Sequence, residues 1–146
     1  MILIGQHILS INKQGQLNLP SSLCAALQNH AYLTQGFDRN LLLMTGESFE
    51  RLYSQIKNTS ISDPLARLLV RMFLANAVEL HLDASGQVQV PSALQEYAGA
   101  EDKVVVVGQG DYFELWAPAK WNEQSVALGS AEANVDRFTK FNLAAA

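Results

Sequence analysis

The sequence contains a single cysteine, Cys24, and no apolar run long enough to form a membrane-spanning helix. One cysteine cannot form an intrachain disulfide, which suits a protein that works in a reducing compartment. A helix that crosses a bilayer needs about 18 or more consecutive apolar residues, so we expect no membrane span. The start, MILIGQHILSI, lacks both a basic region and a small-residue cleavage site and is not expected to be a signal peptide. These absences predict a soluble, cytoplasmic protein.

Charged residues are few, and the basic ones are outnumbered. Ten Lys and Arg residues against fourteen Asp and Glu residues give a formal net charge of −4. This balance argues against a generally basic nucleic-acid or membrane binder, although it leaves room for a local basic patch. Apolar residues make up 49% of the chain, which indicates a globular protein. A chain of 146 residues can hold one ordinary domain or two small units that share a core.

Motifs for catalysis and metal binding are also missing. No G-x-S-x-G, P-loop or Rossmann fingerprint is present. Cys24 lies in the apolar segment LCAAL without a basic neighbour, which indicates a core position. His81 and Asp83 would point to the same side of a strand, but two ligands do not make a metal site, and surface polar residues beside a turn are the simpler interpretation. His7 and His30 are isolated in the sequence. We therefore predict no enzyme, no metal and no cofactor.

What the chain does contain is an internal repeat. The segment INKQGQLNLP at 11–20 recurs as LDASGQVQVP at 82–91. The matching positions are turn formers, the residue after each turn and the proline that follows: Asn12 with Asp83, Gly15 with Gly86, Gln16 with Gln87, and Pro20 with Pro91. A turn-forming segment that recurs with its flanking strands indicates a tandem duplication.

Each half predicts the same order of elements. Two alternating strands form a β-hairpin whose glycine, Gly15 in the first half, closes the turn with φ > 0. A short helix starts at the proline, two further strands follow, and a second helix ends the half. In the first half this helix, at 47–57, is expected to bury Phe49, Leu52, Tyr53 and Ile56. The predicted units are a first repeat at 1–62, a connecting helix at 63–76, a second repeat at 77–128 and a C-terminal tail at 129–146, in which Val135, Phe138 and Phe141 suggest an amphipathic segment.

The connecting helix has a clear start, with Asp63 as N-cap and Pro64 in the first turn. Arg67 and Arg71 share a face apart from its apolar stripe. This pair suits a basic ridge towards DNA or a neighbouring subunit. It also suits a solvated face or ion pairs with Glu47, Glu50 or Glu79, and we favour this structural interpretation.

A lone hairpin is only marginally stable in water, so two copies are expected to bury each other's apolar faces. This gives a pseudo-twofold domain in which the register decides which side chains point inward. The side chains expected to interleave are Ile8, Ile11, Leu17, Leu19, Leu80, Leu82, Val88 and Val90.

This combination of motifs resembles the MraZ family of bacterial transcription factors, in the AbrB-like swapped-hairpin superfamily. The resemblance lies in the two turns, the Pro-initiated helices, the D-P-x-x-R-x-x-x-R segment and VVVVGQGDYFELWAPAKW at 104–121, and it covers residues 1–125. It implies an α+β fold, made of tandem AbrB-like swapped-hairpin β-barrel halves with pseudo-twofold symmetry and flanking helices. It also implies assembly of a ring and binding to repeated DNA elements.

The resemblance further implies that the hairpin tips contact DNA. In that family the tips read Asp-x-Lys-Gly-Arg, whereas here Gln14 and Ser85 stand at the lysine position and Gln16 and Gln87 at the arginine position. This removes cations that would contact phosphate, while glutamine can still pair with adenine. The tips keep one basic residue, Lys13. The candidate DNA-binding residues are Lys13, Gln14, Gln16, Asn18, Ser85, Gln87 and Gln89, and the turn-forming residues are Asn12, Gly15, Asp83 and Gly86.

Two hypotheses follow. The first is a cytoplasmic, ring-forming regulator that binds a direct-repeat DNA operator and is nucleoid-associated when bound, with no membrane or small-molecule partner. The second is a degenerate homo-oligomerisation or protein-interaction module with weak or no DNA binding. The architecture favours the first hypothesis, and the loss of charge at the tips favours the second.

Overall fold

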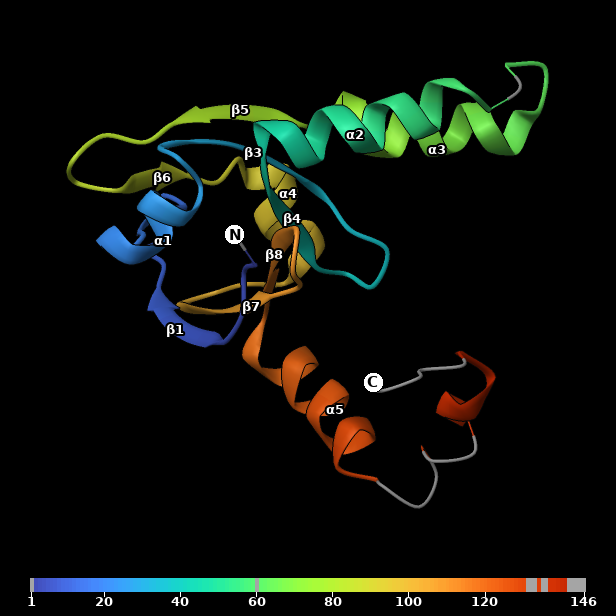
Figure 1. The fold of residues 1–146 in the computed structure, drawn as a ribbon. Helices are drawn as coiled ribbons and strands as arrows, with labels where there is room; N and C mark the ends of the chain where they lie inside the picture. The colour runs from blue at the N-terminus through green and yellow to red at the C-terminus, as the bar shows by residue number, and fades with distance from the viewer. Residues whose placement is uncertain (1, 60, 131–133, 135–136, 142–146) are drawn as a thin grey trace.

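A computed structural model describes residues 2–59, 61–130, 134 and 137–141 of the chain. Strands and helices follow one another in the same order in both halves (Figure 1). The elements of the first half and the connecting helix are β1 (Gln6–Ser10), β2 (Gln16–Asn18), α1 (Ser21–Ala26), β3 (His30–Gln35), β4 (Leu41–Thr45), α2 (Gly46–Lys57) and α3 (Pro64–Ala75). Those of the second half are β5 (Val78–His81), β6 (Gln87–Gln89), α4 (Ser92–Ala98), β7 (Lys103–Gly108), β8 (Tyr112–Trp116), α5 (Pro118–Gly129) and a 3₁₀ turn (Thr139–Phe141).

The strands form one antiparallel six-stranded sheet, in the order β1-β7-β8-β4-β3-β5, and a separate two-stranded ribbon of β2 and β6. The order is palindromic, because exchanging the two halves maps β1 onto β5, β7 onto β3 and β8 onto β4. In the sheet the symmetry passes through the register pair Leu42 and Glu114, and in the ribbon through Leu17 and Val88. The duplication therefore produces the predicted α+β, pseudo-twofold arrangement, and both repeats contribute strands to one sheet. The boundaries at 62, 76 and 128 remain a prediction.

The predicted hairpin within each half is wrong in its pairing. β1 pairs with β7 and β2 pairs with β6, while β1 and β2 share only the bridge between Ile11 and Leu17. The exchange gives the five-residue β1 a partner along its whole length, which the three-residue β2 could not supply. Across the described residues no strand pairing joins β1 to β5, so hydrogen bonding leaves the expected barrel open.

The largest core lies between the sheet and the ribbon and contains residues from both halves, such as Leu17 (2% exposed) and Val106 (0%). Cys24 is part of it, as predicted, and burial raises the pKa of its thiol. Seven of the eight side chains expected to interleave are buried or pack against this core. Ile8 is the exception at 70% exposed, because its neighbour Leu9 occupies the inward position of β1.

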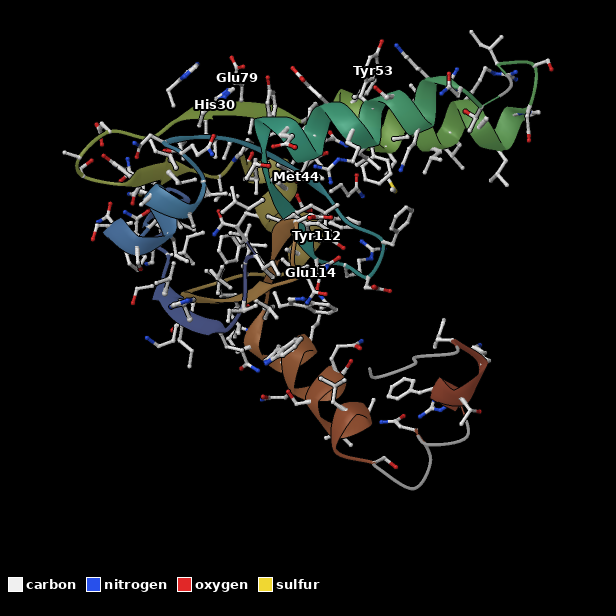
Figure 2. All side chains as sticks on the ribbon, viewed as in Figure 1. His30, Met44, Tyr53, Glu79, Tyr112 and Glu114 are labelled. Atoms are coloured by element: carbon white, nitrogen blue, oxygen red, sulfur yellow. The ribbon has the colours of Figure 1, made fainter. Side chains whose placement is uncertain are left out.

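The helices α2 and α3 form an antiparallel pair that extends away from the sheet (Figure 1). Their cluster is centred on Phe73 and Ile56, and it packs against the outer side of β4. Asp63 caps α3 as predicted, since its carboxylate accepts a hydrogen bond from Leu65 N at 2.9 Å. The expected burial of Tyr53 is wrong: this ring, labelled on α2 in Figure 2, is 44% exposed.

In the second half, α5 starts at Pro118 as predicted, and Trp121 packs against Trp116 with ring centroids 5.7 Å apart. Of the proposed amphipathic tail, Val135 lies outside the described residues, and Phe138 and Phe141 are exposed. None of the helices in the described ranges is long and apolar enough to cross a membrane.

Candidate nucleic-acid interface

The turn after β1 is organised by Asn12. Its side-chain oxygen accepts hydrogen bonds from Gln14 N at 3.0 Å and Gln16 N at 2.9 Å, and its main-chain oxygen accepts one from Gly15 N at 3.0 Å. Asn side chains stabilise turns in this way because they imitate a turn of backbone. The turn presents Lys13 and Gln14 to solvent.

The turn after β5 is built in the same way around Asp83. Its carboxylate accepts hydrogen bonds from the Ser85 hydroxyl and from Ser85 N, and Gly86 N donates to the Asp83 main-chain oxygen at 3.0 Å. The hydroxyl of Ser85, followed by its N–H, lowers the pKa of Asp83 below its ordinary value. This second turn therefore carries a negative charge and presents Ser85 to solvent.

The two turns are held against the strands of the opposite repeat. Val90 N donates to Gly15 O, and Leu19 N donates to Gly86 O, both at 2.8 Å. Gly15 has φ +80° and Gly86 has φ +67°, a region that side chains disfavour. The crossing fixes both turns to the same ribbon, although 71 positions separate them in the sequence.

The ribbon between the turns has two different faces. Leu17 and Val88 form the inward pair, each 2% exposed. The two pairs on either side, Gln16 with Gln89 and Asn18 with Gln87, point outward because side chains alternate along a strand. The ribbon therefore presents four neutral amides on one surface, which we call the amide face (Gln16, Asn18, Gln87 and Gln89).

The four amides differ in what they bind within the chain. Gln16 accepts a hydrogen bond from the Asn12 side chain at 3.0 Å, and Gln89 donates to the main-chain oxygen of Gln14. Both therefore brace the first turn. Among the described residues, the side chains of Asn18 and Gln87 have no hydrogen-bond partner. This register pair is left with its donors and acceptors free.

Arg67 and Arg71 do not belong to this surface. They line an apolar groove on the α2–α3 pair with Tyr53 and Val70, whereas the β5–β6 turn projects from the other end of the molecule (Figure 1). Arg67 donates to Ile61 O at 2.9 Å. Neither arginine forms an ion pair with a carboxylate within the part of the chain that the structure describes. The ion pairs expected with Glu47, Glu50 or Glu79 are absent there, and the choice between a structural face and a contact with a neighbouring subunit stays a prediction.

The structure brings together a group of side chains that sequence reasoning separated. Asp83 accepts a hydrogen bond from Ser85 rather than joining His81. His81 Nε2 lies 3.3 Å from the Glu79 carboxylate, and His30 Nε2 lies 3.1 Å from the same carboxylate. His30 was therefore not isolated. Its proximity to His81 follows from the pairing of β3 with β5, which spans the two repeats and leaves no local pattern in the sequence.

Exchange of strands between two tandem repeats, with the ribbon and its turns at the crossing, defines an AbrB-like swapped-hairpin protein. The comparisons with known proteins identify the family. A family model described as "MraZ protein, putative antitoxin-like" matches residues 73–142. Curated relatives that are at least 30% identical over most of this chain carry the same name, so the chain belongs to the MraZ family.

Three curated relatives, each named "Transcriptional regulator MraZ", illustrate the similarity. The protein from Thermomicrobium roseum is 35% identical over 127 residues, which cover 87% of this chain and 89% of the relative. The relative from Roseiflexus castenholzii is 30% identical over 94% of both chains, and that from Herpetosiphon aurantiacus is 33% identical over 81% and 82%. These relatives confirm the predicted family. They also confirm the prediction of a MraZ-like transcriptional regulator rather than an enzyme.

Proposed function

We propose that this transcriptional regulator binds DNA through the amide face and the two turns beside it. The observation that supports this proposal most directly is the free pair formed by Asn18 and Gln87 on the exposed face of the two-stranded ribbon. The major groove of B-DNA is about 12 Å wide and admits a two-stranded ribbon. Asn and Gln amides pair with the N6 and N7 positions of adenine, so these two side chains are suited to reading adenine.

The other candidates have positioning roles in this proposal. Gln16 and Gln89 brace the first turn, which holds Lys13 in solvent. Lys13 contacts phosphate, and Gln14 and Ser85 add neutral hydrogen bonds at the tips. Because Asp83 opposes this single cation, each protomer binds weakly and depends on several protomers acting together.

We propose that the protein is a homo-oligomer, with a ring as the arrangement that places several amide faces on repeated DNA elements. Exposed apolar side chains at the end of the α2–α3 pair support a contact between copies, among them Ile61 (84% exposed), Leu65 (71%) and Leu68 (60%). Leu65 and Leu68 line an apolar groove along α3 together with Phe37 and Met72. Ile61 lines the neighbouring groove that holds Arg67 and Arg71. DNA binding would place the oligomer on the nucleoid.

Fluorescence anisotropy tests the DNA contact. The duplex is selected from a random pool by the protein and presented as direct repeats at two salt concentrations, with a scrambled duplex for comparison. Lys13→Ala should weaken binding to both duplexes and reduce the salt slope by about one per bound chain. Lys57→Ala, at the far end of α2, is the matched control and should leave the slope unchanged.

The amide variants give a different result in the same assay. Asn18→Ala and Gln87→Ala should each reduce the preference for the selected duplex by about 1–3 kcal/mol without changing the salt slope. Equal loss of affinity for both duplexes would contradict base reading.

The single cation at the tips favours one other function, a homo-oligomeric interaction module. The interaction-module hypothesis predicts an intact oligomer that selects no duplex from the pool and causes no change in DNA anisotropy at low salt. That outcome would overturn the DNA-binding proposal.

A further inference from the structure

We infer that His30, Glu79 and His81 form a binding site for a divalent transition-metal ion, of which Zn²⁺ is the probe. The three side chains offer two imidazole nitrogens and a carboxylate, with all ligand atoms within 4.8 Å of one another. Two histidines and one carboxylate form a ligand set that binds zinc and related ions, and imidazole disfavours magnesium and calcium.

The backbone brings the two imidazoles together. His30 and His81 are register partners on β3 and β5. Since Leu82 N bonds to Asn29 O, the neighbouring pair of His30 and His81 is a non-hydrogen-bonded pair, in which side chains come closest. The rings stack with centroids 5.0 Å apart and planes inclined by 8°.

Glu79 completes the site from the position two residues before His81. One carboxylate oxygen lies 3.1 Å from His30 Nε2, and the other lies 3.3 Å from His81 Nε2. A tetrahedral zinc site separates its ligand atoms by roughly 3.3 Å, given bonds of about 2.0–2.1 Å. Both carboxylate–imidazole distances match this separation, and the two stacked imidazoles would turn towards each other so that all three ligand atoms reach one ion.

The carboxylate is already oriented. Tyr32 OH donates a hydrogen bond to Glu79 at 2.7 Å, and Tyr32 stacks on Phe49 with ring centroids 4.2 Å apart. The Tyr32 hydrogen bond holds the carboxylate facing the two imidazoles, as partners behind a metal ligand do. Figure 2 shows Glu79 and His30 at the outer surface of the molecule. The side chains of His30 and His81, at 38% and 77% exposed, leave the site open to an ion from solvent.

The fold does not need these residues at this edge. In the pseudo-symmetric position, Leu9 of β1 corresponds to Leu80 of β5, and the pair equivalent to His30 and His81 is Lys103 with Ser10. Glu79 corresponds there to Ile8. The opposite edge thus forms the same strand pairing with no metal ligand at these positions. Strand pairing therefore does not explain why two histidines and a glutamate meet here.

A bound ion would link the two repeats beside the second turn. His30 comes from the first repeat, and Glu79 and His81 come from the second, on an edge strand that leads directly to Asp83. Since the unfolded chain lacks this preformed site, metal binding should stabilise the folded protein and hold the base of that turn.

Isothermal titration calorimetry of the untagged full chain with ZnCl₂ tests the inference. One saturable site per chain is expected in the wild type. His30→Asn, His81→Asn and Glu79→Gln should each reduce the affinity at least about tenfold, and Tyr32→Phe should reduce it by about tenfold through loss of orientation. His7→Asn on β1 is the matched control and should bind as the wild type does.

Thermal unfolding provides a second readout. Zn²⁺ should raise the midpoint of the wild type and of His7→Asn but not that of His81→Asn, while the three proteins should unfold alike without metal. The inference is overturned by the absence of saturable binding in the wild type, or by equal affinity and equal thermal shifts in wild type and His81→Asn.

Discussion

Gly15 and Val90 lie so close that a Cβ added to the glycine would stand 2.5 Å from the Val90 carbonyl oxygen. The pseudo-symmetric pair, Gly86 and Leu19, approaches even more closely. Each contact accompanies a backbone hydrogen bond of 2.8 Å, from Val90 N to Gly15 O and from Leu19 N to Gly86 O. The swap therefore depends on two glycines for close approach as well as for positive φ.

Gly15→Ala and Gly86→Ala should each lower the free energy of unfolding by at least about 3 kcal/mol, measured by urea denaturation. The positive φ alone costs roughly 1–2 kcal/mol for a residue with a Cβ. The clash with the opposite strand adds to this cost, because the ribbon must shift and its hydrogen bond lengthens.

Gly110→Ala separates the two causes. Gly110 also has a positive φ, at +90°, but an added Cβ would meet nothing within 4 Å. Its alanine variant should lose only the conformational cost, about 1–2 kcal/mol. Equal losses at Gly110 and Gly15 would show that close approach contributes nothing.

Ile11→Ala should destabilise the protein by about 2–5 kcal/mol, because Ile11 is 4% exposed in the shared core. Ile8→Ala is a matched control from the same segment. Its side chain is 70% exposed, so the change should stay within about 0.5 kcal/mol. Chemical denaturation of both variants measures the difference, and similar losses would contradict the register of β1.

Glu114 should make stability depend on pH. Burial raises the pKa of this carboxyl above its ordinary value of 4.5, and hydrogen bonds from Trp116 Nε1 at 3.1 Å and Asn40 Nδ2 at 3.0 Å offset part of the rise. The folded state holds the Glu114 proton more tightly than the unfolded state does, so protonation of Glu114 stabilises the fold. This stabilisation is complete below about pH 4.5 and is lost as the pH rises through the folded-state pKa. The stability of Glu114→Gln relative to the wild type should therefore increase from pH 4 to pH 7.

Asp83 should show the opposite dependence. Its pKa is lowered, chiefly by the Ser85 hydroxyl, so its contribution is present above its ordinary pKa of 3.8 and is lost as the pH falls through the folded-state value. The advantage of the wild type over Asp83→Asn should shrink at acidic pH. Unfolding curves at several pH values measure Glu114→Gln and Asp83→Asn against the wild type. The same pH dependence in both variants would contradict the opposite pKa shifts of Glu114 and Asp83.

Leu68→Glu should shift the protein to a smaller assembly in light scattering, since Leu68 lies at the groove on α3 that we propose contacts another copy. A charge buried at such a contact is costly. Leu128→Glu on α5 is matched in residue type and exposure, at 62% against 60% for Leu68, and should leave the mass unchanged. An unchanged mass for Leu68→Glu would exclude this part of α3 from the interface.

The local features of the chain followed from its sequence. Asp63 and Pro64 start α3 as expected, because capping depends on only a few neighbouring residues. Gly15 and Gly86 adopt the positive φ that their turns require, and Cys24 lies in the core that its apolar segment predicted. The recurrence of the same turn predicted the duplication and, with it, the pseudo-twofold order of the strands.

The sequence by itself thus determined the elements and the turns, since each depends on residues close together in the chain. It also determined the repeat, since the two copies can be matched segment by segment. Only the tertiary structure decided that β1 pairs with β7 and β2 with β6, that Ile8 faces solvent, and that His30 meets His81. These outcomes depend on the register between strands far apart in sequence. That register is chosen by how much apolar surface the two repeats can bury together, a quantity that no local pattern contains.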